Sequence, residues 1–573
     1  MKNQPVFPRG MVIPEATIEE VPDDVNANDQ GELVEEIPGV AMAAKMAEAH
    51  GMEPRNLAEA KRSPDWPRWQ EAMEVECQVL EKFRTWRLKK PPPNTNIVGC
   101  RWTFVVKRDA AGAIVRYRAR LVAQGFSQIP GVDFFETYAP VVKMASMRIL
   151  FAMATRHNFE IHQVDIKGAY LNGEFEEGEV IYMCLPPGIS LTDNKTLVLQ
   201  LLKPIYGLRQ SSRHWYRKFS SVLMGPLLMK RCEVDQAVFY HVEGESVMAL
   251  ASHVDDCSAV ASSVELEEEI KTELRKAFEI SDLGEINWIL GIAIKRDRVA
   301  RTIGLSQKSY INSMLSRYGF ENVKPAAMPM DPSMHFSTSQ SPKTTQEFAE
   351  MKDKPYREAV GSLMYVSLGT RPDITYAVSV LSKFADNPGL VHWNTAKRVF
   401  AYLAGTKDLW LTYGDSSAEL EGYTDADGSM HEDRKAISGY AFLLDGGAVS
   451  WSSKKQEIIA LSTTEAEYVA TTHAAKEALW LRSLIGEIFG EFTGPTTLYG
   501  DNQGAIALTR DHQYHARTKH IDIRFHFIRW IIAEGKLKIV YCPTENMIAD
   551  TLTKALPSTK VKHFAYSLGL HKD

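Results

Sequence analysis

Two adjacent aspartates, Asp255 and Asp256, interrupt an apolar run that extends from Met248 to Ser262. The run predicts a pair of buried strands, and buried carboxylates are costly unless a cation neutralises them. A third carboxylate, Asp165, ends another apolar run, so we expect the three acids to meet at one edge of a sheet. Such a group predicts divalent cations, and Mg²⁺ is favoured because substrate phosphates can complete its shell of oxygen ligands. An isolated Asp-Asp pair, by contrast, is more often a solvated turn.

A second group of acids follows in the last third of the chain with a different spacing. Asp425 and Asp501 end strand-like runs, Glu467 lies in a long helical pattern, and Asp550 stands where the last helix is predicted to open. Four acids at strand ends and helix starts can converge above one sheet, which predicts two-metal hydrolysis of a phosphodiester. Each acid alone is equally compatible with a helix N-cap or a solvent-facing position, and this alternative is strongest for Asp550.

The 573 residues suffice for several hydrophobic cores, and changes of pattern divide them into four parts. Residues 1–65 predict a disordered acidic leader, because the first 60 carry 12 acidic and 4 basic residues. Residues 66–325 alternate between helix and strand patterns, and 326–413 predict a Pro/Ser/Thr-rich linker followed by helices. Residues 414–573 restart as a separate α/β domain. The fold class is therefore multi-domain α+β.

The part from 66 to 325 predicts a mixed sheet with helices on one face. Its first segment, 66–86, has helical apolar spacing, and two strand-like runs over 99–126 predict a basic hairpin. A further amphipathic helix is predicted over 135–158. From Arg84 to Gly125 there are ten Lys or Arg and one Asp. This density predicts a polyanionic partner or, with equal weight, a solvated charged face.

The six cysteines are scattered and form no C-x-x-C pair, which argues against a zinc site and a disulfide scaffold. Their pattern favours a reducing compartment. The sequence shows neither a signal peptide nor an apolar run long enough to span a bilayer. We therefore expect an intracellular protein with no membrane partner.

Longer motifs then occur in a characteristic order. The motifs RWTFVVKRDAAGAIVRYRARLVAQGFSQIPGVDFFETYAPVVK, HQVDIKGAYLNG, VIYMCLPPG, YGLRQSSRHWY, HVDD and DLGEINWILGI resemble the reverse transcriptase of copia-type LTR retrotransposons (Pseudoviridae-like). The later motifs SGYAFLLDGGAVSWSSKKQEIIALSTTEAEYVA, LYGDNQGAIAL, RTKHIDIRFHFIRW and PTENMIADTLTKAL resemble the ribonuclease H that follows it. The resemblance extends from about Trp66 to Leu556. It implies a right-hand polymerase with fingers, palm and a primer grip or thumb-like part, followed by an α/β ribonuclease H-like domain.

The resemblance also implies a function. It implies an RNA-directed and DNA-directed DNA polymerase with ribonuclease H activity on RNA–DNA hybrids. The implied partners are an RNA template, a DNA primer, the RNA–DNA hybrid and dNTPs, while the oligomeric state stays open. The implied cofactor is Mg²⁺, two ions per active site, with Mn²⁺ as a substitute. The implied location is the cytoplasm, in a virus-like particle when the element is intact, or the nucleus.

The same resemblance assigns roles to individual residues. Seven acids have catalytic and metal-binding roles: Asp165, Asp255 and Asp256 in the polymerase, and Asp425, Glu467, Asp501 and Asp550 in the ribonuclease H. Four residues resemble those that bind the incoming nucleotide: Lys107, Arg118, Arg120 and Tyr170. Arginine binds phosphate oxygens bidentately, and a tyrosine ring can exclude a 2′-hydroxyl. Five residues resemble those near the primer and template: Gly207, Gln210, His253, Trp288 and Gly291. A solvated hairpin for the basic residues, and plain core for Tyr170 and Trp288, are the structural alternatives.

The chain departs from the family pattern beside the catalytic acids. His253 stands where an aromatic residue is usual, Ser212 replaces a proline, and Gly428 stands where an aromatic residue is common. These changes keep open the alternative of a catalytically impaired, nucleic-acid-binding remnant of a retrotransposon. The missing capsid, protease and integrase patterns, together with the acidic leader, predict either a fragment of a polyprotein or a truncated copy of such an element, and Met1 favours the truncated copy.

Overall fold

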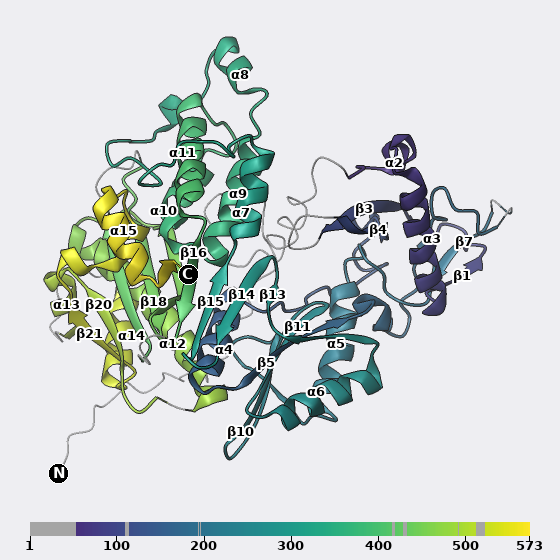
Figure 1. Cartoon of the computed structure of the whole chain (residues 1–573), viewed down its shortest axis with the longest axis horizontal. Coiled ribbons are helices and arrows are strands. Elements are labelled where there is room, and N and C mark those ends of the chain that lie inside the picture. The colour runs from purple at the N-terminus through teal and green to yellow at the C-terminus, as the bar shows by residue number, and fades with distance from the viewer. Residues whose placement is uncertain are drawn as a thin grey trace, which may run out of the picture.

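The structure, a computed structural model, describes residues 53–108, 114–192, 194, 196–414, 419–427, 433–490, 492–510 and 522–572. Figure 1 shows a purple and blue lobe on the right, a blue and teal region in the centre, and a green and yellow lobe on the left. Within the described part of the chain, no helix combines the length and the apolar character needed to cross a bilayer. Helices and strands are mixed throughout, as the predicted α+β class requires.

The right-hand lobe contains the predicted basic hairpin. Strands β3 (Cys100–Arg108) and β4 (Ile114–Ala123) pair antiparallel, and they pack on α3 (Trp66–Lys82). Trp69, Trp102 and the apolar residues around them form a separate core in this lobe. A small sheet beside the hairpin has the order β1 (Trp86–Lys89), β7 (Val198–Leu201), β6 (Tyr182–Met183) and β2 (Ile97–Val98).

Part of the predicted disordered leader is folded. Residues 57–62, which fall within it, form helix α2 (Leu57–Arg62). The side chain of Asn56 accepts a hydrogen bond from the backbone N–H of Glu59, which caps this helix, and Ala60 is fully buried against α3. The prediction of disorder is therefore wrong for this segment, and residues 1–52 of the leader lie outside the described residues.

The central region is a six-stranded sheet. Its order is β12 (Ile280–Glu285), β5 (Glu160–Ile166), β11 (Asp256–Ala261), β10 (Ser246–His253), β9 (Val238–Glu243) and β8 (Lys230–Arg231). Helices α5 (Ser211–Met224) and α6 (Val264–Ala277) bury one face of it with residues such as Phe219 and Ile270. The other face packs on α4 (Met144–Arg156). The prediction of helices on a single face is therefore wrong, because alternate residues of β10 and β11 are apolar on both faces.

Helix α4 is also shorter than predicted. It begins at Met144 and not at Phe135. Pro140 explains the difference, because a proline disfavours the helical conformation of the preceding residue and lacks a backbone donor. Residues 125–143 instead form a long connection from β4 to α4.

A second sheet joins the central region to the last domain. Its order is β13 (Trp288–Ile289), β14 (Ile292–Asp297), β15 (Thr302–Ser306), β16 (Leu409–Tyr413) and β22 (Leu570–Lys572). The helices that surround it are α7 (Lys308–Arg317), α8 (Thr345–Met351), α9 (Tyr356–Gly369), α10 (Thr375–Ser382) and α11 (Leu390–Thr406). Strand β22 shares this sheet although it follows the last domain, so the domains are structurally interlocked.

The last domain is a five-stranded sheet with helices. Its order is β19 (Gly447–Lys455), β18 (Ile437–Leu444), β17 (Glu421–Asp427), β20 (Thr496–Gly500) and β21 (Leu537–Tyr541). The first three strands are antiparallel, and β20 and β21 run parallel to β17. The helices are α12 (Thr463–Phe489), α13 (Gln503–Arg510), α14 (Asp522–Ala533) and α15 (Ser558–Ser567). Helix α12 begins after its N-cap Ser462, whose hydroxyl accepts from Glu465 N.

Two arginines of α4 fix the last domain to the central region. Buried Arg148 donates to the carbonyl oxygens of Val449 at 2.8 Å, Leu368 at 2.8 Å and Gly369 at 3.0 Å. Its guanidinium also lies 3.9 Å from the ring centroid of Trp451. Since Leu368 and Gly369 end α9, the cation satisfies carbonyls that a helix end leaves unpaired. Burial lowers the pKa of Arg148 to about 10, so it stays protonated at neutral pH.

The second arginine, Arg156, binds Asp445 at the turn between β18 and β19. Its Nε donates to the two carboxylate oxygens at 3.1 and 3.0 Å, and an Nη donates at 2.6 Å. The Asp445 side chain is fully buried. A third contact joins α12 of the last domain to the central region: Trp480 Nε1 donates to the Val234 carbonyl at 2.8 Å.

Replacement of Arg148 by methionine tests this attachment. Arg148→Met keeps an apolar chain of similar length but leaves three buried carbonyls without their donor, so we expect unfolding to become easier by about 2–4 kcal/mol. Guanidinium denaturation measures the change. The matched control is Arg357→Met, because Arg357 also binds a backbone carbonyl and an aspartate but is 66% exposed; it should change stability by less than about 1 kcal/mol. Equal effects of the two variants would contradict the role of Arg148.

Candidate polymerase and nuclease sites

The turn that carries Asp255 has a strained backbone. Strands β10 and β11 are joined by Val254 and Asp255 alone, and Val254 has φ 62°. A β-branched residue rarely adopts this left-handed conformation, which costs of order 1–3 kcal/mol. Two hydrogen bonds hold the turn: Trp215 Nε1 donates to the Val254 carbonyl at 2.8 Å, and Ile166 N donates to the Asp255 carbonyl at 2.9 Å. The strain therefore occurs at the predicted polymerase site.

Three aspartates meet at this turn. In the antiparallel pairing of β5 with β11, Asp165 lies directly opposite Asp256, and Asp255 precedes Asp256 in the turn. Side chains directly opposite one another share one face of the sheet and lie close together. All three residues are half-buried. The backbone register therefore places the three predicted acids at one turn, at the end of the sheet that faces the basic hairpin, although their carboxylate oxygens do not all lie within 4.8 Å of one another.

Arg120 extends from the hairpin to this group. Its guanidinium lies 3.8 Å from the Asp255 carboxylate and 4.4 Å from the ring centroid of Tyr206. The Tyr206 ring meets the Tyr170 ring edge to face at 4.7 Å, and Ser212 Oγ donates to Tyr170 Oη at 3.3 Å. Burial raises the pKa of Tyr170, and raises the pKa of Tyr206 to about 12. Both phenols are therefore neutral, and two rings and one guanidinium stand beside the aspartates.

Sequence reasoning missed Tyr206. Tyr206 precedes Gly207 in the motif YGLRQ, and this glycine was the one signal in the sequence of a close backbone approach. In the structure Gly207 has φ 93°, and a Cβ at this position would lie 2.1 Å from the Ala123 carbonyl oxygen. This close approach, with the hydrogen bond from Ala123 N to the Tyr206 carbonyl at 2.8 Å, fixes Tyr206 beside the end of β4.

The other predicted nucleotide-binding residues differ in their surroundings. Arg118 is half-buried two residues before Arg120 on β4, and burial, with the charge of Arg120, lowers its pKa. The buried carboxyl of Glu76 faces the same pair, and burial raises its pKa. Lys107 lies on β3, and its side chain is outside the described residues.

The five predicted primer and template residues do not form one group. His253 is half-buried at the end of β10, opposite Asp256. Trp288 is 37% exposed on β13, and Gly291 follows in a turn where a Cβ would lie 2.6 Å from Tyr365 Oη. Gln210 is fully buried: it donates to the Asp133 carbonyl at 2.8 Å and accepts from Gln128 Nε2 at 3.1 Å. Its side chain is engaged inside the protein, and its predicted place near the primer and template stays a prediction.

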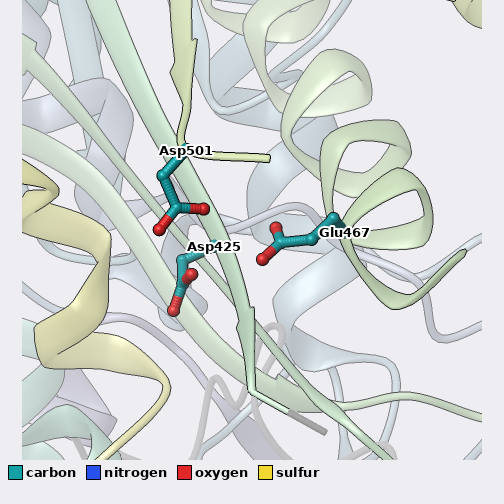
Figure 2. Close-up of side chains that lie close together, drawn as sticks. All are labelled: Asp425, Glu467 and Asp501. Atoms are coloured by element: carbon teal, nitrogen blue, oxygen red, sulfur yellow. The ribbon is translucent and has the colours of Figure 1, made fainter. Parts of the chain in front are cut away.

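A second acidic cluster lies in the last domain. Figure 2 shows Asp425, Glu467 and Asp501, from β17, α12 and the end of β20, with their carboxylates facing one another. One oxygen of each lies within 4.8 Å of the others, and no other such group of His, Cys, Asp or Glu occurs in the described part of the chain. Burial, and then the charge of Asp425, raises the pKa of Glu467 to about 10. These oxygens suit a hard divalent cation.

Asp550, the fourth predicted member, lies outside this cluster and is bridged to it by a lysine. It lies in the short helix η7 (Ile548–Leu552), whereas the last helix, α15, opens only at Ser558. Lys554 Nζ lies 2.7 Å from the Asp550 carboxylate and 3.6 Å from that of Asp425. Burial, and then the charge of Asp425, raises the pKa of Asp550 to about 6. Three of the four acids therefore cluster, and Lys554 links the fourth to them.

Of the positions that depart from the family pattern, Ser212 has a contact of its own, the hydrogen bond to Tyr170. His253 keeps its predicted place beside the aspartates. Gly428 lies outside the described residues.

Comparison with known proteins shows the family of the chain. The family described as reverse transcriptase (RNA-dependent DNA polymerase) matches residues 83–332. The Pol polyprotein of transposon TNT 1-94 from Nicotiana tabacum is 40% identical over 522 residues, which are 91% of this chain and 39% of the relative. The putative transposon Ty5-1 protein of Saccharomyces cerevisiae is 31% identical over 318 residues, 55% of this chain and 100% of the relative. The chain belongs to the reverse transcriptases of copia-type retrotransposon Pol proteins.

The chain spans less than two fifths of the length of the plant polyproteins that it matches, 39% of TNT 1-94 and 36% of transposon RE1 from Arabidopsis thaliana. Among solved structures, a foamy viral protease-reverse transcriptase in complex with an RNA/DNA hybrid aligns over 83% of this chain and 54% of that chain. Its TM-score is 0.44, at 12% sequence identity.

Glu467→Gln tests whether the acidic cluster is a cation site. With a chelator present, the variant should melt at a higher temperature than the wild type, because wild-type Glu467 must take up a proton to be buried beside Asp425 at neutral pH, whereas the amide is already neutral. With excess Mg²⁺ the wild type should gain stability and the variant should gain less. Thermal unfolding measures both. The exposed control Glu534→Gln should behave as the wild type, and an equal Mg²⁺ response of wild type and Glu467→Gln would contradict the site.

When a chelator is present, the stability of the wild type and that of Glu467→Gln are expected to depend differently on pH. The raised pKa means that folded Glu467 binds a proton that the unfolded chain has already lost at neutral pH. Wild-type stability should therefore fall as the pH rises from about 5 toward 10, and Glu467→Gln should lack that part of the decline.

Proposed function

We propose that this chain is an RNA-directed and DNA-directed DNA polymerase that also cleaves the RNA strand of RNA–DNA hybrids. The observation that supports polymerisation best is the register that sets Asp165 opposite Asp256, with Asp255 in the turn between them and Arg120. The partners are an RNA template, a DNA primer, their hybrid and dNTPs. Contacts with the duplex backbone make binding sensitive to salt.

Asp165, Asp255 and Asp256 would hold two Mg²⁺ ions. Bound there, the ions supply activation of the primer 3′-hydroxyl and stabilisation of the leaving pyrophosphate. Arg118 and Arg120 grip the triphosphate oxygens, since both project from β4 toward the aspartates. Tyr170 sets its ring against the sugar and excludes a 2′-hydroxyl. Tyr206 holds both Arg120 and Tyr170 in place through its ring contacts.

Asp425, Glu467, Asp501 and Asp550 carry the hydrolytic activity. The first three would hold divalent ions, which supply an activated water and stabilise the leaving oxygen. Lys554 keeps Asp550 beside Asp425, and Thr544 Oγ1 donates to Asp501 Oδ2 at 2.9 Å, which orients that carboxylate. The cluster is buried at Asp425 and Glu467, so the hybrid approaches from the half-exposed Asp501.

Asp255→Asn separates the two activities. We expect it to lower extension of a DNA primer on an RNA template at least a hundredfold while hybrid cleavage continues, because Asp255 lies in another domain from the acidic cluster. Asp501→Asn should do the reverse, and both products can be followed in one reaction with two labels. Normal extension by Asp255→Asn would refute the polymerase assignment. A wild type that binds primer–template but neither extends nor cleaves it would establish the alternative of an impaired remnant.

Tyr170→Ala tests the sugar gate. Loss of the ring opens space beside the sugar, so incorporation of ribonucleotides relative to deoxyribonucleotides should rise about tenfold or more. Tyr170→Phe keeps the ring and loses only the hydrogen bond from Ser212, and it should retain wild-type discrimination. Single-nucleotide kcat/KM values for dNTP and rNTP provide the measurement, and unchanged discrimination in Tyr170→Ala would exclude the gate.

A further inference from the structure

The connection between β4 and α4 exposes an unusual set of apolar side chains. Residues 125–139, named here the aromatic loop, expose Phe126 at 76%, Phe135 at 72% and Tyr138 at 68% of their surfaces. Ile129 and Val132 of the same loop are also exposed. Exposed apolar side chains gathered in one short segment mark an interaction surface more often than scattered ones do.

A buried polar network gives this loop a defined conformation. The Asp133 carboxylate, 6% exposed, accepts hydrogen bonds from Asn96 Nδ2 at 2.5 Å and from Ile129 N at 2.7 Å. Gln210 donates to the Asp133 carbonyl, and Gln128 donates to Gln210. Because these buried groups satisfy one another, the outward position of the rings follows from a built structure and not from a loose segment.

Both ends of the loop are attached beside the polymerase site. At one end, Gly125 N donates to the Gly207 carbonyl at 3.1 Å, next to Tyr206. Just beyond the other end, Val142 N donates to the Ser252 carbonyl at 3.3 Å, next to His253. The loop therefore runs from the nucleotide-binding residues to the catalytic turn and borders the site between them.

The charges on the loop suit a nucleic acid. Of its two acids, Asp133 is buried in the network and Glu136 forms an ion pair with Arg213. Exposed Arg209 donates to the Gly125 carbonyl at 3.1 Å and lies 5.6 Å from the Phe134 ring centroid. Phe134 is itself buried, but the hydrogen bond to Gly125 fixes the guanidinium one residue before exposed Phe126. Exposed rings on a loop with an anchored guanidinium at its start match the two parts of a single strand, its bases and its phosphates.

We propose that the aromatic loop binds the single-stranded template next to the polymerase site, with Phe126, Phe135 and Tyr138 stacking on unpaired bases. The inference rests on the proposed polymerase function for its choice of strand. Stacking is indifferent to sequence, because every base has a flat face, so the loop can hold any template. Gln210 acts through the loop as a positioning residue, since its buried amide joins Gln128 to Asp133.

Binding without nucleotides tests the loop directly. The full chain is titrated into a labelled primer–template that is either blunt or carries a single-stranded 5′ template overhang, and the ratio of the two Kd values is measured. The wild type should prefer the overhang about tenfold or more, as expected for stacking of one or two bases. The double variant Phe126→Ala/Phe135→Ala should lose most of that preference and bind the blunt duplex as before.

Two control variants complete the experiment. Phe126→Trp/Phe135→Trp keeps flat rings and should keep the preference. Phe348→Ala removes a ring that is 51% exposed on α8, at the top of Figure 1 and away from the loop, and should behave as the wild type. The slope of log Kd against log salt should be the same for the wild type and the alanine variant, because the rings carry no charge.

Several results would overturn the proposal. The wild type could show no preference for the overhang, or Phe126→Ala/Phe135→Ala could keep the preference. The same variant could also lose binding to the blunt duplex and to the overhang equally. A change of oligomeric state in the alanine variant, measured by light scattering with the overhang preference intact, would assign the loop to a protein partner instead. A wild type that prefers the overhang but does not extend the primer would refute the proposed polymerase function and leave the loop as a single-strand binding surface.

Discussion

The buried guanidinium of Arg148 joins three parts of the chain that are distant in sequence. It comes from the helix behind the palm-like sheet, and it binds the end of α9 and a strand of the last domain. Because these carbonyls have lost their water, they depend on the cation for hydrogen bonds, and the cation depends on them and on Trp451 for its solvation. The position of the acidic cluster relative to the catalytic turn follows from this contact and from the ion pair of Arg156 with Asp445.

The two acidic sites differ in how their charge is tolerated. The aspartates of the proposed polymerase site are half-buried at a strained turn, where Arg120 stands beside Asp255. In the last domain Asp425 and Glu467 are buried, and the pKa of each is raised. Cation binding at the second site must therefore displace protons, whereas at the first site it competes with a guanidinium. The two sites are expected to respond differently to pH and to salt.

Local patterns predicted much of this structure. The basic hairpin, the long helix that carries Glu467 and the strands that carry Asp165 and Asp425 all follow from periodicity, which depends on neighbouring residues. The contacts of Arg148, the burial of Gln210 and the place of Tyr206 depend on partners far away in sequence, and no local pattern reports them. Helix α4 was predicted too long because apolar spacing continued through Pro140, where backbone geometry overrides it.

The sheet that contains β15, β16 and β22 imposes an order on folding. Strand β15 ends at Ser306, its neighbour β16 begins at Leu409, and β22 is drawn from residues 570–572. The pairing of β15 with β16 spans the helices between Ser306 and Leu409, and the pairing of β16 with β22 spans the last domain, so both have a high contact order and form slowly. During synthesis the edge of β16 stays unpaired until the ribosome has released β22, so this edge is the place where a nascent chain is most exposed to wrong strand pairing.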